Sequence, residues 1–363
     1  ALAEGLQGRG HDVTLLISRK KVDARLIAKY PQLRFERMPG TGFGWNPVDA
    51  ARCLVSQLQA VVFVSRFVRR WRPQGMVGFG GFTSASLILV GALQRVPVVL
   101  HEANRVPGRA IRLLARMAQR LYLPLGVRLP GLPVEIIRHM GLPVRREISR
   151  QPAETARRAL GLYPHGKVLV ILGGSQGASA LNDWARREVP QLAAEGIQVY
   201  CLTGLGKDIA EVLELKSRTG VAVRAVFAPF SDRMAELMSA ADLVVSRAGA
   251  GTLAELARCE TPAILVPYPH AADDHQRANA AFFEKQGGGL VVEQAFLATL
   301  RAEVLDAIFN DWLLRKFRAN LHRMERANSL ELMLNDLEQL VRGPSTAAQP
   351  GPATPASRKT ATA

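Results

Sequence analysis

A repeated pattern of short apolar segments, small-residue turns and helices constrains the fold more than any other feature of the chain. Residues 243–245 form an apolar segment of strand length that leads into the turn SRAGAGT at 246–252, and a helical segment carrying Glu255 follows. A second apolar segment at 263–266 opens into PYPH and a polar helix start at 273–279. Units of this kind build parallel α/β sheets, whose ligands bind beyond the carboxyl ends of the strands.

Polar side chains gather at these strand ends, where they would face a ligand and not a core. The glycines alone would equally fit an ordinary strand–turn–helix unit, so the polar cluster is what favours a binding site. The N–H groups at the start of the helix would attract an anion to it. The cluster comprises Arg247, Glu255, His270, Asp274, His275, Gln276 and Asn279.

Two further glycine-rich turns follow apolar segments. The segment at 168–172 consists of Val, Leu and Ile and leads into GGSQGA at 173–178, the strongest phosphate-loop candidate in the chain. This loop is neither a Walker loop nor GxGxxG, because both the Lys-Ser/Thr pair and that spacing are absent. The second turn, at Gly80 and Gly81, follows a strand-like segment at 75–79 and permits close approach of a phosphate to the backbone.

The net charge of +16 is confined to the first part of the chain. Residues 1–150 hold 24 Lys and Arg against 8 Asp and Glu, whereas residues 151–363 hold 23 of each. This asymmetry indicates an anionic partner for the N-terminal half, which could be nucleic acid, anionic lipid or pyrophosphate. A basic surface that is merely solvated is the alternative. The sparse cysteines (Cys53, Cys201, Cys259) are typical of reduced, cytosolic thiols.

These motifs, together with HEAN at 101–104 and GLPVR at 141–145, resemble the signatures of the MurG family, which transfers N-acetylglucosamine (GlcNAc) to a lipid-linked muramyl peptide. The resemblance extends to about Leu340 and implies an α/β glycosyltransferase-B architecture, in which two Rossmann-like domains with parallel sheets face each other across a cleft. It places an N-terminal acceptor and membrane-facing domain at 1–144 and a donor domain at 145–311. Helices at 312–342 are expected to return to the first domain, and residues 343–363 read as a disordered tail.

The resemblance also assigns the side chains that hold UDP-GlcNAc. Glu255 is expected on the ribose hydroxyls, Gln276 with His275 and Asn279 on the GlcNAc hydroxyls, and the loop 173–178 on the diphosphate. The full expected donor set is Arg145, Ser175, Gln176, Gly177, Phe230, Ser231, Arg247, Ala250, Thr252, Glu255, His275, Gln276 and Asn279.

On the acceptor side the resemblance assigns Gly80, Gly81, Glu102 and Asn104. Val55, Leu58 and Val61 recur at three-residue spacing in a helix predicted over 48–71, and either core packing or a membrane-binding patch explains them. Arg105, Arg109, Arg112 and Arg116 are expected on one helix as a basic stripe. The family's first strand and the His proposed as its base are expected before residue 1, so no catalytic residue is assigned, and the activity of this chain stays open.

The implied reaction is inverting transfer of GlcNAc from UDP-GlcNAc to the muramyl 4-hydroxyl of lipid I, which gives lipid II, at the cytoplasmic side of the inner membrane. We expect no metal or other cofactor, because Asp-x-Asp is absent and helix N-termini can neutralise the diphosphate. The expected partners are UDP-GlcNAc, undecaprenyl-pyrophosphoryl-muramyl peptide and an anionic membrane surface, without nucleic acid. Transfer to diacylglycerol, UDP-GlcNAc 2-epimerisation and non-enzymatic nucleic-acid binding remain alternatives.

Overall fold

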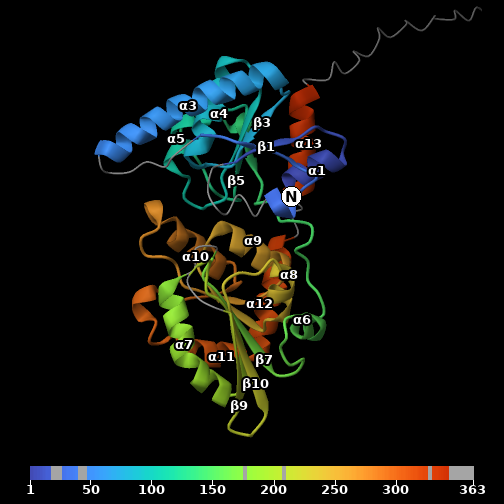
Figure 1. Cartoon of the computed structure of the whole chain (residues 1–363), viewed down its shortest axis with the longest axis vertical. Helices are drawn as coiled ribbons and strands as arrows, with labels where there is room; N and C mark the ends of the chain where they lie inside the picture. Colours follow the sequence, from blue (N-terminus) through green and yellow to red (C-terminus); the bar gives the residue numbers. More distant parts are fainter. Residues whose placement is uncertain (18–26, 40–46, 175–177, 207–209, 326–328, 343–363) are drawn as a thin grey trace, which may run out of the picture.

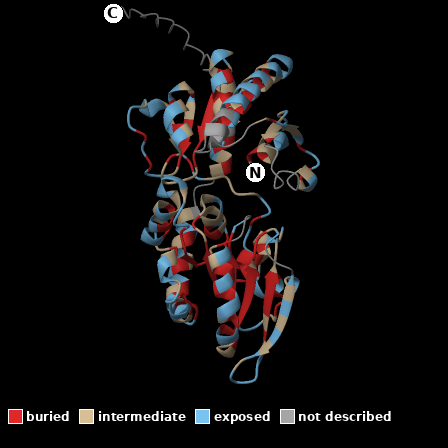
Figure 2. Ribbon diagram, turned by 60° about the vertical axis from the view of Figure 1, so that its left-hand side comes forward, coloured by how far each residue is buried: buried red, intermediate tan, exposed pale blue. Residues whose placement is uncertain are grey.

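The computed structural model describes residues 1–17, 27–39, 47–174, 178–206, 210–325 and 329–342. They form two α/β domains placed end to end, with the N-terminal half of the chain in one domain and most of the C-terminal half in the other (Figure 1). Buried residues concentrate around the sheet of each domain, so each has its own core (Figure 2). This confirms the predicted α/β fold.

The N-terminal domain is built on a four-stranded parallel sheet in the order β3-β4-β5-β6, beside a parallel pair β1-β2. Alternate residues of β4 and β5 face opposite sides of the sheet, as strand geometry requires. Val98 and Leu100 join the core beneath α3 and α4, whereas Val99 and Tyr122 pack against α13. The elements are α1 (Leu2–Gly8), β1 (Thr14–Ile17), β2 (Arg34–Arg37), α3 (Pro47–Trp71), β3 (Met76–Gly78), α4 (Gly81–Leu93), β4 (Val98–His101), α5 (Arg109–Leu114), β5 (Arg120–Leu123) and β6 (Ile137–His139).

The C-terminal domain is built on a seven-stranded sheet in the order β13-β12-β11-β7-β8-β10-β9. Helices α7 and α11 cover one face, and α8, α9 and α10 cover the other. The elements are α6 (Ala153–Ala159), β7 (Lys167–Leu172), α7 (Ser179–Ala194), β8 (Ile197–Leu202), β9 (Glu211–Lys216), β10 (Ala222–Ala228), α8 (Met234–Ala240), β11 (Leu243–Ser246), α9 (Ala250–Arg258), β12 (Ala263–Leu265), α10 (His275–Lys285), β13 (Gly289–Val291) and α11 (Leu300–Ile308).

Two local expectations are corrected. The large sheet is parallel except at its edge, where β9 pairs antiparallel with β10. Arginines 105–116 do not share one helix, because Pro107 and Gly108 precede α5, which spans Arg109–Leu114, and a 3-10 turn follows it. Arg105 therefore lies in the loop after β4, outside the predicted stripe.

The last two helices belong to different domains. α12 (Asp311–Glu325) buries Leu314 and Leu321 in the C-terminal domain. α13 (Ser329–Arg342) packs on α1 and on the N-terminal sheet, and Asp336 accepts a 2.8 Å hydrogen bond from the Tyr122 hydroxyl. The chain thus crosses between the domains twice, first in the irregular segment between β6 and α6 and then between α12 and α13. The predicted boundary at residues 144–145 lies in the first of these segments, and the tail at 343–363 lies outside the described residues.

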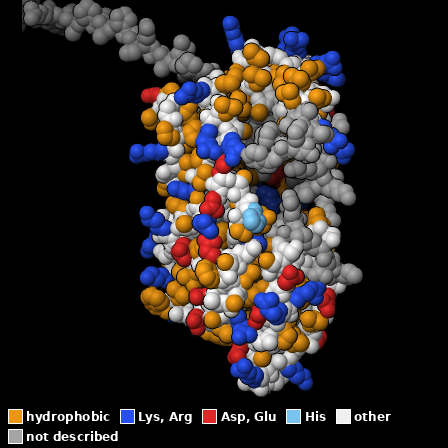
Figure 3. All heavy atoms as spheres, turned by 90° about the vertical axis from the view of Figure 1, so that its left-hand side faces the viewer, with side chains coloured by type: hydrophobic (Ala, Val, Ile, Leu, Met, Phe, Trp, Pro, Cys, Tyr) orange, Lys and Arg blue, Asp and Glu red, His pale blue; other side chains and the backbone are white. Residues whose placement is uncertain are grey.

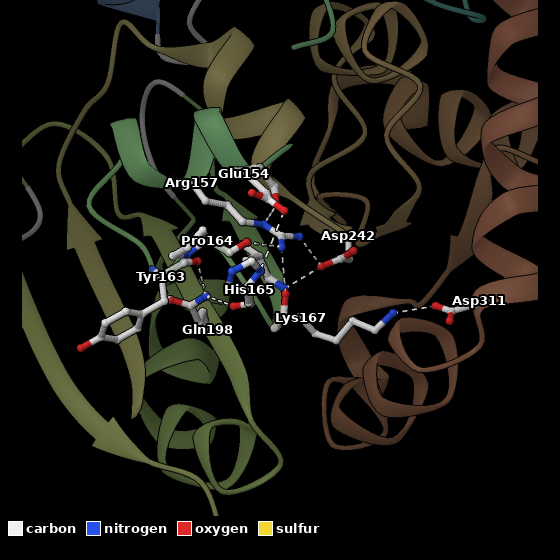
Figure 4. Close-up of polar contacts among 12 residues, drawn as sticks. Glu154, Arg157, Tyr163, Pro164, His165, Lys167, Gln198, Asp242 and Asp311 are labelled. Atoms are coloured by element: carbon white, nitrogen blue, oxygen red, sulfur yellow. Dashed lines mark hydrogen bonds and ion pairs between the residues drawn. The ribbon is translucent and has the colours of Figure 1, made fainter. Parts of the chain in front are cut away.

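A buried arginine joins several segments at the amino ends of the C-terminal strands (Figure 4). The Arg157 guanidinium donates 3.0 Å hydrogen bonds to the carbonyls of Ala240, Pro164 and Gly166, and a 2.8 Å bond to Asp242. Asp242 also accepts a bond from the backbone N–H of Val168, at the start of β7. The guanidinium charge is thereby paired with the Asp242 carboxylate and with three carbonyl oxygens, which is the condition for burying a charge.

Replacing Arg157 by Ala should destabilise the C-terminal domain by about 3 kcal/mol, because Asp242 and three carbonyls lose their donor in a largely buried place. Urea unfolding measures this loss. Arg158→Ala is the control, since Arg158 lies on the same helix with its side chain 62% exposed and should cost under about 0.5 kcal/mol. Equal destabilisation by the two variants would contradict the assignment.

Candidate active site between the domains

A cavity of about 250 Å³ lies where the two domains meet. The N-terminal domain and the connection between the domains form one side of it, and the start of α9 forms the other. Its position beyond the carboxyl ends of the strands is where open α/β sheets bind ligands. The residues that line it are Ala1, Leu2, Phe79, Leu142, Pro143, Val144, Arg145, Gly251 and Glu255.

Arg145 and Glu255, which both belong to the expected donor set, form the polar centre of this cavity. The Arg145 Nη2 atom lies 3.1 Å from Glu255 Oε1, and its Nη1 atom lies 3.5 Å from Glu147. Glu147 in turn accepts a 3.0 Å hydrogen bond from the Tyr30 hydroxyl and pairs with Lys29. The ion pair therefore joins the donor helix to a network that continues into the N-terminal domain.

Burial dominates the titration of Glu255. Its side chain is only 19% exposed, and this desolvation raises the pKa of the carboxyl above its ordinary value, although Arg145 acts in the opposite direction. A carboxylate in this position can accept two hydrogen bonds, as a pair of vicinal hydroxyls would require.

The two expected phosphate-binding turns lie next to each other, because β7 pairs with β11 in the sheet. Gly249 caps α9. Among the described residues, no side chain caps this helix end, and none has an atom within 4 Å of a Cβ placed at Gly249. Ala250 and Thr252 occupy the first turn of α9, so their N–H groups face the gap. Gly174, at φ +79°, ends the described part of the other turn, and Ser175, Gln176 and Gly177 lie outside the described residues.

Several other residues of the expected donor site form hydrogen bonds within the protein. The Arg247 guanidinium donates to the carbonyls of Val266 and Pro267 and to Gln294, so it holds the end of β12. His275 Nδ1 lies 2.7 Å from the Ala272 carbonyl oxygen, and Gln276 Oε1 accepts from the N–H of Tyr268. Arg247 therefore supports the strand ends that form the site.

Asn279 departs furthest from its expected contact with GlcNAc. Its side chain is buried, and its amide bonds to Ala248, Asn104 and Arg105. Glu102 is likewise buried and accepts from the N–H groups of Asn104 and Gly108. Asn279, Glu102 and Asn104 thus shape the junction of the two domains, and their assignment to the sugar and to the acceptor stays a prediction.

The remaining site predictions fall at loop ends. Gly80 caps α4 at φ +71°, a conformation that suits glycine, and Gly81 begins that helix. Phe230 is 36% exposed after β10, and the Ser231 hydroxyl accepts from the N–H of Arg233. Sequence reasoning missed Phe79, Tyr30 and Glu147, because no spacing connects Tyr30 to a carboxylate 117 residues away.

The apolar patch on α3 is real but differently composed. Leu54, Val55, Leu58 and Val62 are 49–64% exposed, whereas Val61 packs partly against the domain core. Each three-residue step turns a helix by about 300°, so Val61 lies about 120° from Val55 on the helix circumference. Figure 3 shows apolar and basic side chains side by side over the N-terminal domain.

Comparison with known protein families shows which family this fold belongs to. The glycosyltransferase family 28 N-terminal domain matches residues 1–123, and the family 28 C-terminal domain matches residues 168–330. The chain belongs to glycosyltransferase family 28. As predicted, it is therefore a glycosyltransferase.

Its relatives and structural neighbours agree. A UDP-N-acetylglucosamine--N-acetylmuramyl-(pentapeptide) pyrophosphoryl-undecaprenol N-acetylglucosamine transferase of Opitutus terrae is 63% identical over 354 residues, which cover 98% of this chain and 94% of the relative. The crystal structure of MurG from Acinetobacter baumannii superposes with a TM-score of 0.69 at 23% identity over 93% of this chain and 94% of that one. A UDP-N-acetylglucosamine 2-epimerase from Listeria monocytogenes shares the fold at a TM-score of 0.65, with 12% identity, 93% of this chain and 91% of that one. The glycosyltransferase-B architecture is thereby confirmed.

Two observations concern metals and membranes. In the described part of the chain no three His, Cys, Asp or Glu side chains come together as they would around a metal ion, and the expectation of a metal-free site stays a prediction. Among the helices that the structure describes, none combines the length and apolarity needed to cross a bilayer.

The protonation of Glu255 should control donor binding. Because burial raises its pKa, the carboxyl should lose its charge at a higher pH than an exposed glutamate, and affinity for UDP should fall as the pH is lowered into that range. UDP titrations between neutral pH and pH 5 measure this. Glu255→Gln should weaken UDP binding by about 1–3 kcal/mol at neutral pH and flatten the pH dependence. An unchanged pH profile in the variant would remove Glu255 from the site.

Proposed function

We propose that this family 28 glycosyltransferase moves GlcNAc from UDP-GlcNAc to the muramyl 4-hydroxyl of undecaprenyl-pyrophosphoryl-muramyl peptide, lipid I, and so forms lipid II for peptidoglycan synthesis. The observation that carries the proposal is 63% identity, over nearly the whole chain, to a relative named for this transfer. The hydroxyl oxygen attacks the anomeric carbon, the bond to UDP breaks, and the hydroxyl proton passes to a base. No residue of this chain is assigned as that base.

The donor site of this proposal lies at the start of α9. Glu255 would accept the ribose hydroxyls while Arg145 keeps its charge compensated at 3.1 Å. The N–H groups at Ala250 and Thr252, with the neighbouring loop after β7, would receive the diphosphate and stabilise it as it leaves. Gln276 and His275 begin α10 at the same edge of the sheet and would lie near the sugar.

The acceptor would enter from the opposite side of the cavity. Gly80 and Gly81 start α4 there, and the backbone N–H groups at this helix start suit the acceptor's pyrophosphate. The basic excess of residues 1–150 favours the same side for an anionic lipid. A 2-epimerase would share the fold, but it needs no lipid acceptor and would leave these features without a role.

The assay that tests the proposal offers the protein UDP-GlcNAc with lipid I, with diacylglycerol or without acceptor. We expect a GlcNAc-lipid product and UDP only with lipid I, because the relative is named for that acceptor. Release of UDP-ManNAc without acceptor would identify an epimerase, and a glycosylated diacylglycerol would identify the related lipid transferase. Either result would refute the assigned reaction.

We also propose that the N-terminal domain binds the cytoplasmic face of the inner membrane through α3. Leu54, Val55, Leu58 and Val62 form an apolar patch. Exposed arginines follow at the end of the helix, where they can reach anionic headgroups. A nucleic-acid partner would use the arginines but not the apolar patch. The exposed arginines at the end of the helix are Arg66, Arg69, Arg70 and Arg72.

Binding to vesicles that contain anionic lipid tests this surface. Leu58→Asp should reduce the bound fraction about fivefold or more, because it replaces membrane-buried apolar area with a charge that anionic lipid repels. Val212→Asp is the matched control, since Val212 is 58% exposed on β9 in the other domain and should leave vesicle binding unchanged. Equal binding by both variants, or salt-dependent binding to DNA, would contradict the membrane role.

A further inference from the structure

A second cavity, here named the amino-end cavity, lies at the opposite edge of the C-terminal sheet from the proposed donor site. Its volume is about 210 Å³, and Asp242 and Thr261, which precede β11 and β12, form part of its wall. The residue steps from Asp242 along β11 to Arg247 cover roughly 17 Å at about 3.3 Å each. A ligand in this cavity would therefore occupy a place separate from that of the donor substrate.

Charged side chains from separate segments of the chain line the amino-end cavity. Asp242 Oδ2 accepts a 2.8 Å hydrogen bond from the Arg157 guanidinium (Figure 4), and Glu260 pairs with Arg150. Glu260 Oε1 also lies 2.7 Å from His322 Nδ1. Both carboxylates are thus paired, and three guanidinium groups against two carboxylates leave an excess of one positive charge. The charged side chains that line the cavity are Arg150, Arg157, Asp242, Glu260 and Arg318.

The excess charge belongs to Arg318 of α12. Its side chain is 28% exposed, and its ion pair with Asp242 spans 4.0 Å, which is too long for a hydrogen bond. Within the described ranges its guanidinium donates no hydrogen bond to a protein acceptor. Burial lowers the pKa of this guanidinium; Asp242 and Asp311 act in the opposite direction, and the charges of Arg150 and Arg157 add to the lowering. Its five N–H donors therefore lack acceptors where water is largely excluded, which is costly.

A buried hydroxyl in the cavity wall offers a further donor. Ser239 is buried, and its Oγ atom accepts a 3.0 Å hydrogen bond from the backbone N–H of Gln151. Its own hydrogen has no protein acceptor among the residues that the structure describes. The neighbouring Thr261 differs, because its hydroxyl donates to the carbonyl of Met238 at 2.8 Å. The cavity thus presents unused donors beside paired carboxylates, which suits a ligand that only accepts hydrogen bonds.

We propose that the amino-end cavity binds a phosphate group, held by the Arg318 guanidinium and the Ser239 hydroxyl and bridged to Arg150. Phosphate accepts hydrogen bonds on several oxygens and matches the planar fork of arginine. A single water needs about 10–15 Å³ of such space, so a volume of about 210 Å³ accommodates a polyatomic ion. The site goes beyond the proposed transfer, because none of these residues belongs to the donor or acceptor set.

The bound phosphate would link two segments that lead to the N-terminal domain. Arg150 lies between β6 and α6, where the chain first crosses between the domains. Arg318 belongs to α12, which precedes the second crossing. Because such a ligand binds only the folded chain, it would stabilise the C-terminal domain in proportion to its occupancy.

Thermal unfolding of the whole chain in sodium phosphate, at constant ionic strength and with saturating UDP in the donor site, tests the proposal. Phosphate should raise the unfolding temperature by about 3 °C or more above that in sodium chloride. A parallel titration with glycerol 3-phosphate identifies the source: an equal rise supports a site that accepts phosphate monoesters, and no rise supports one for free phosphate. Equal unfolding temperatures in phosphate and chloride would overturn the proposal.

Calorimetric titration of two variants with orthophosphate assigns the site. Arg318→Gln should weaken phosphate binding about tenfold or more, because it removes a charge-assisted hydrogen bond from a largely buried place. Arg315→Gln is the control, since Arg315 is exposed on the same helix and does not line the cavity. Its phosphate affinity should stay within about twofold, and so should the UDP affinity of both variants. Equal phosphate affinity in the two variants would refute the site.

A second measurement needs no substitution. Amide hydrogen exchange of the unmodified protein should slow about threefold or more in segment 148–153 when phosphate replaces chloride, because the ligand would tie Arg150 to α12. With UDP present in both samples, exchange at the start of α9 should not change, since that helix end lies at the opposite edge of the sheet. Unchanged exchange in segment 148–153, or slowing only at α9, would contradict the proposal.

Discussion

The parallel pairing of β7 with β11 is the constraint on which the site depends. Neighbouring parallel strands end at one edge of the sheet, so the turns after them must lie side by side with their helix N-termini facing one gap. This places Gly174 beside Gly249 and brings α9, with Glu255, to the cavity. The antiparallel strand β9 is added at the far edge of the sheet, where it leaves this geometry untouched.

Charge in the cavity is balanced across the junction of the domains. Glu255 is buried enough to raise the pKa of its carboxyl, and Arg145, from the segment that connects the domains, compensates it. A carboxylate held in this way can accept hydrogen bonds from hydroxyls. Because Arg145 already neutralises its charge, it does not compete with the diphosphate for positively charged groups. In the proposed donor site, the diphosphate would bind the neutral backbone N–H groups at the start of α9, which would separate the recognition of ribose from that of phosphate.

The two domains meet through contacts of unequal strength. The ion pairs that Asp273 forms with Arg109 and Arg112 are exposed and screened by water. The buried amide of Asn279 allows only one arrangement that satisfies all its hydrogen bonds. A third connection is covalent, because α13 carries the chain end back to the N-terminal sheet, where Tyr122 and Asp336 join it.

The sequence by itself determined the α/β class and the resemblance to the family, because strand periodicity, glycine-rich turns and helix starts are local signals. It also placed Arg145 and Glu255 in one site through their motifs. Only the tertiary structure decided which partners the polar side chains take: Asn279 lies one turn into α10 and Arg247 follows β11, and both hydrogen-bond to other residues of the protein. The tertiary structure also showed that Val61 packs partly against the core. The contacts of Tyr30 and Asp273 could not be predicted from local spacing, because their partners are more than a hundred residues away in the sequence.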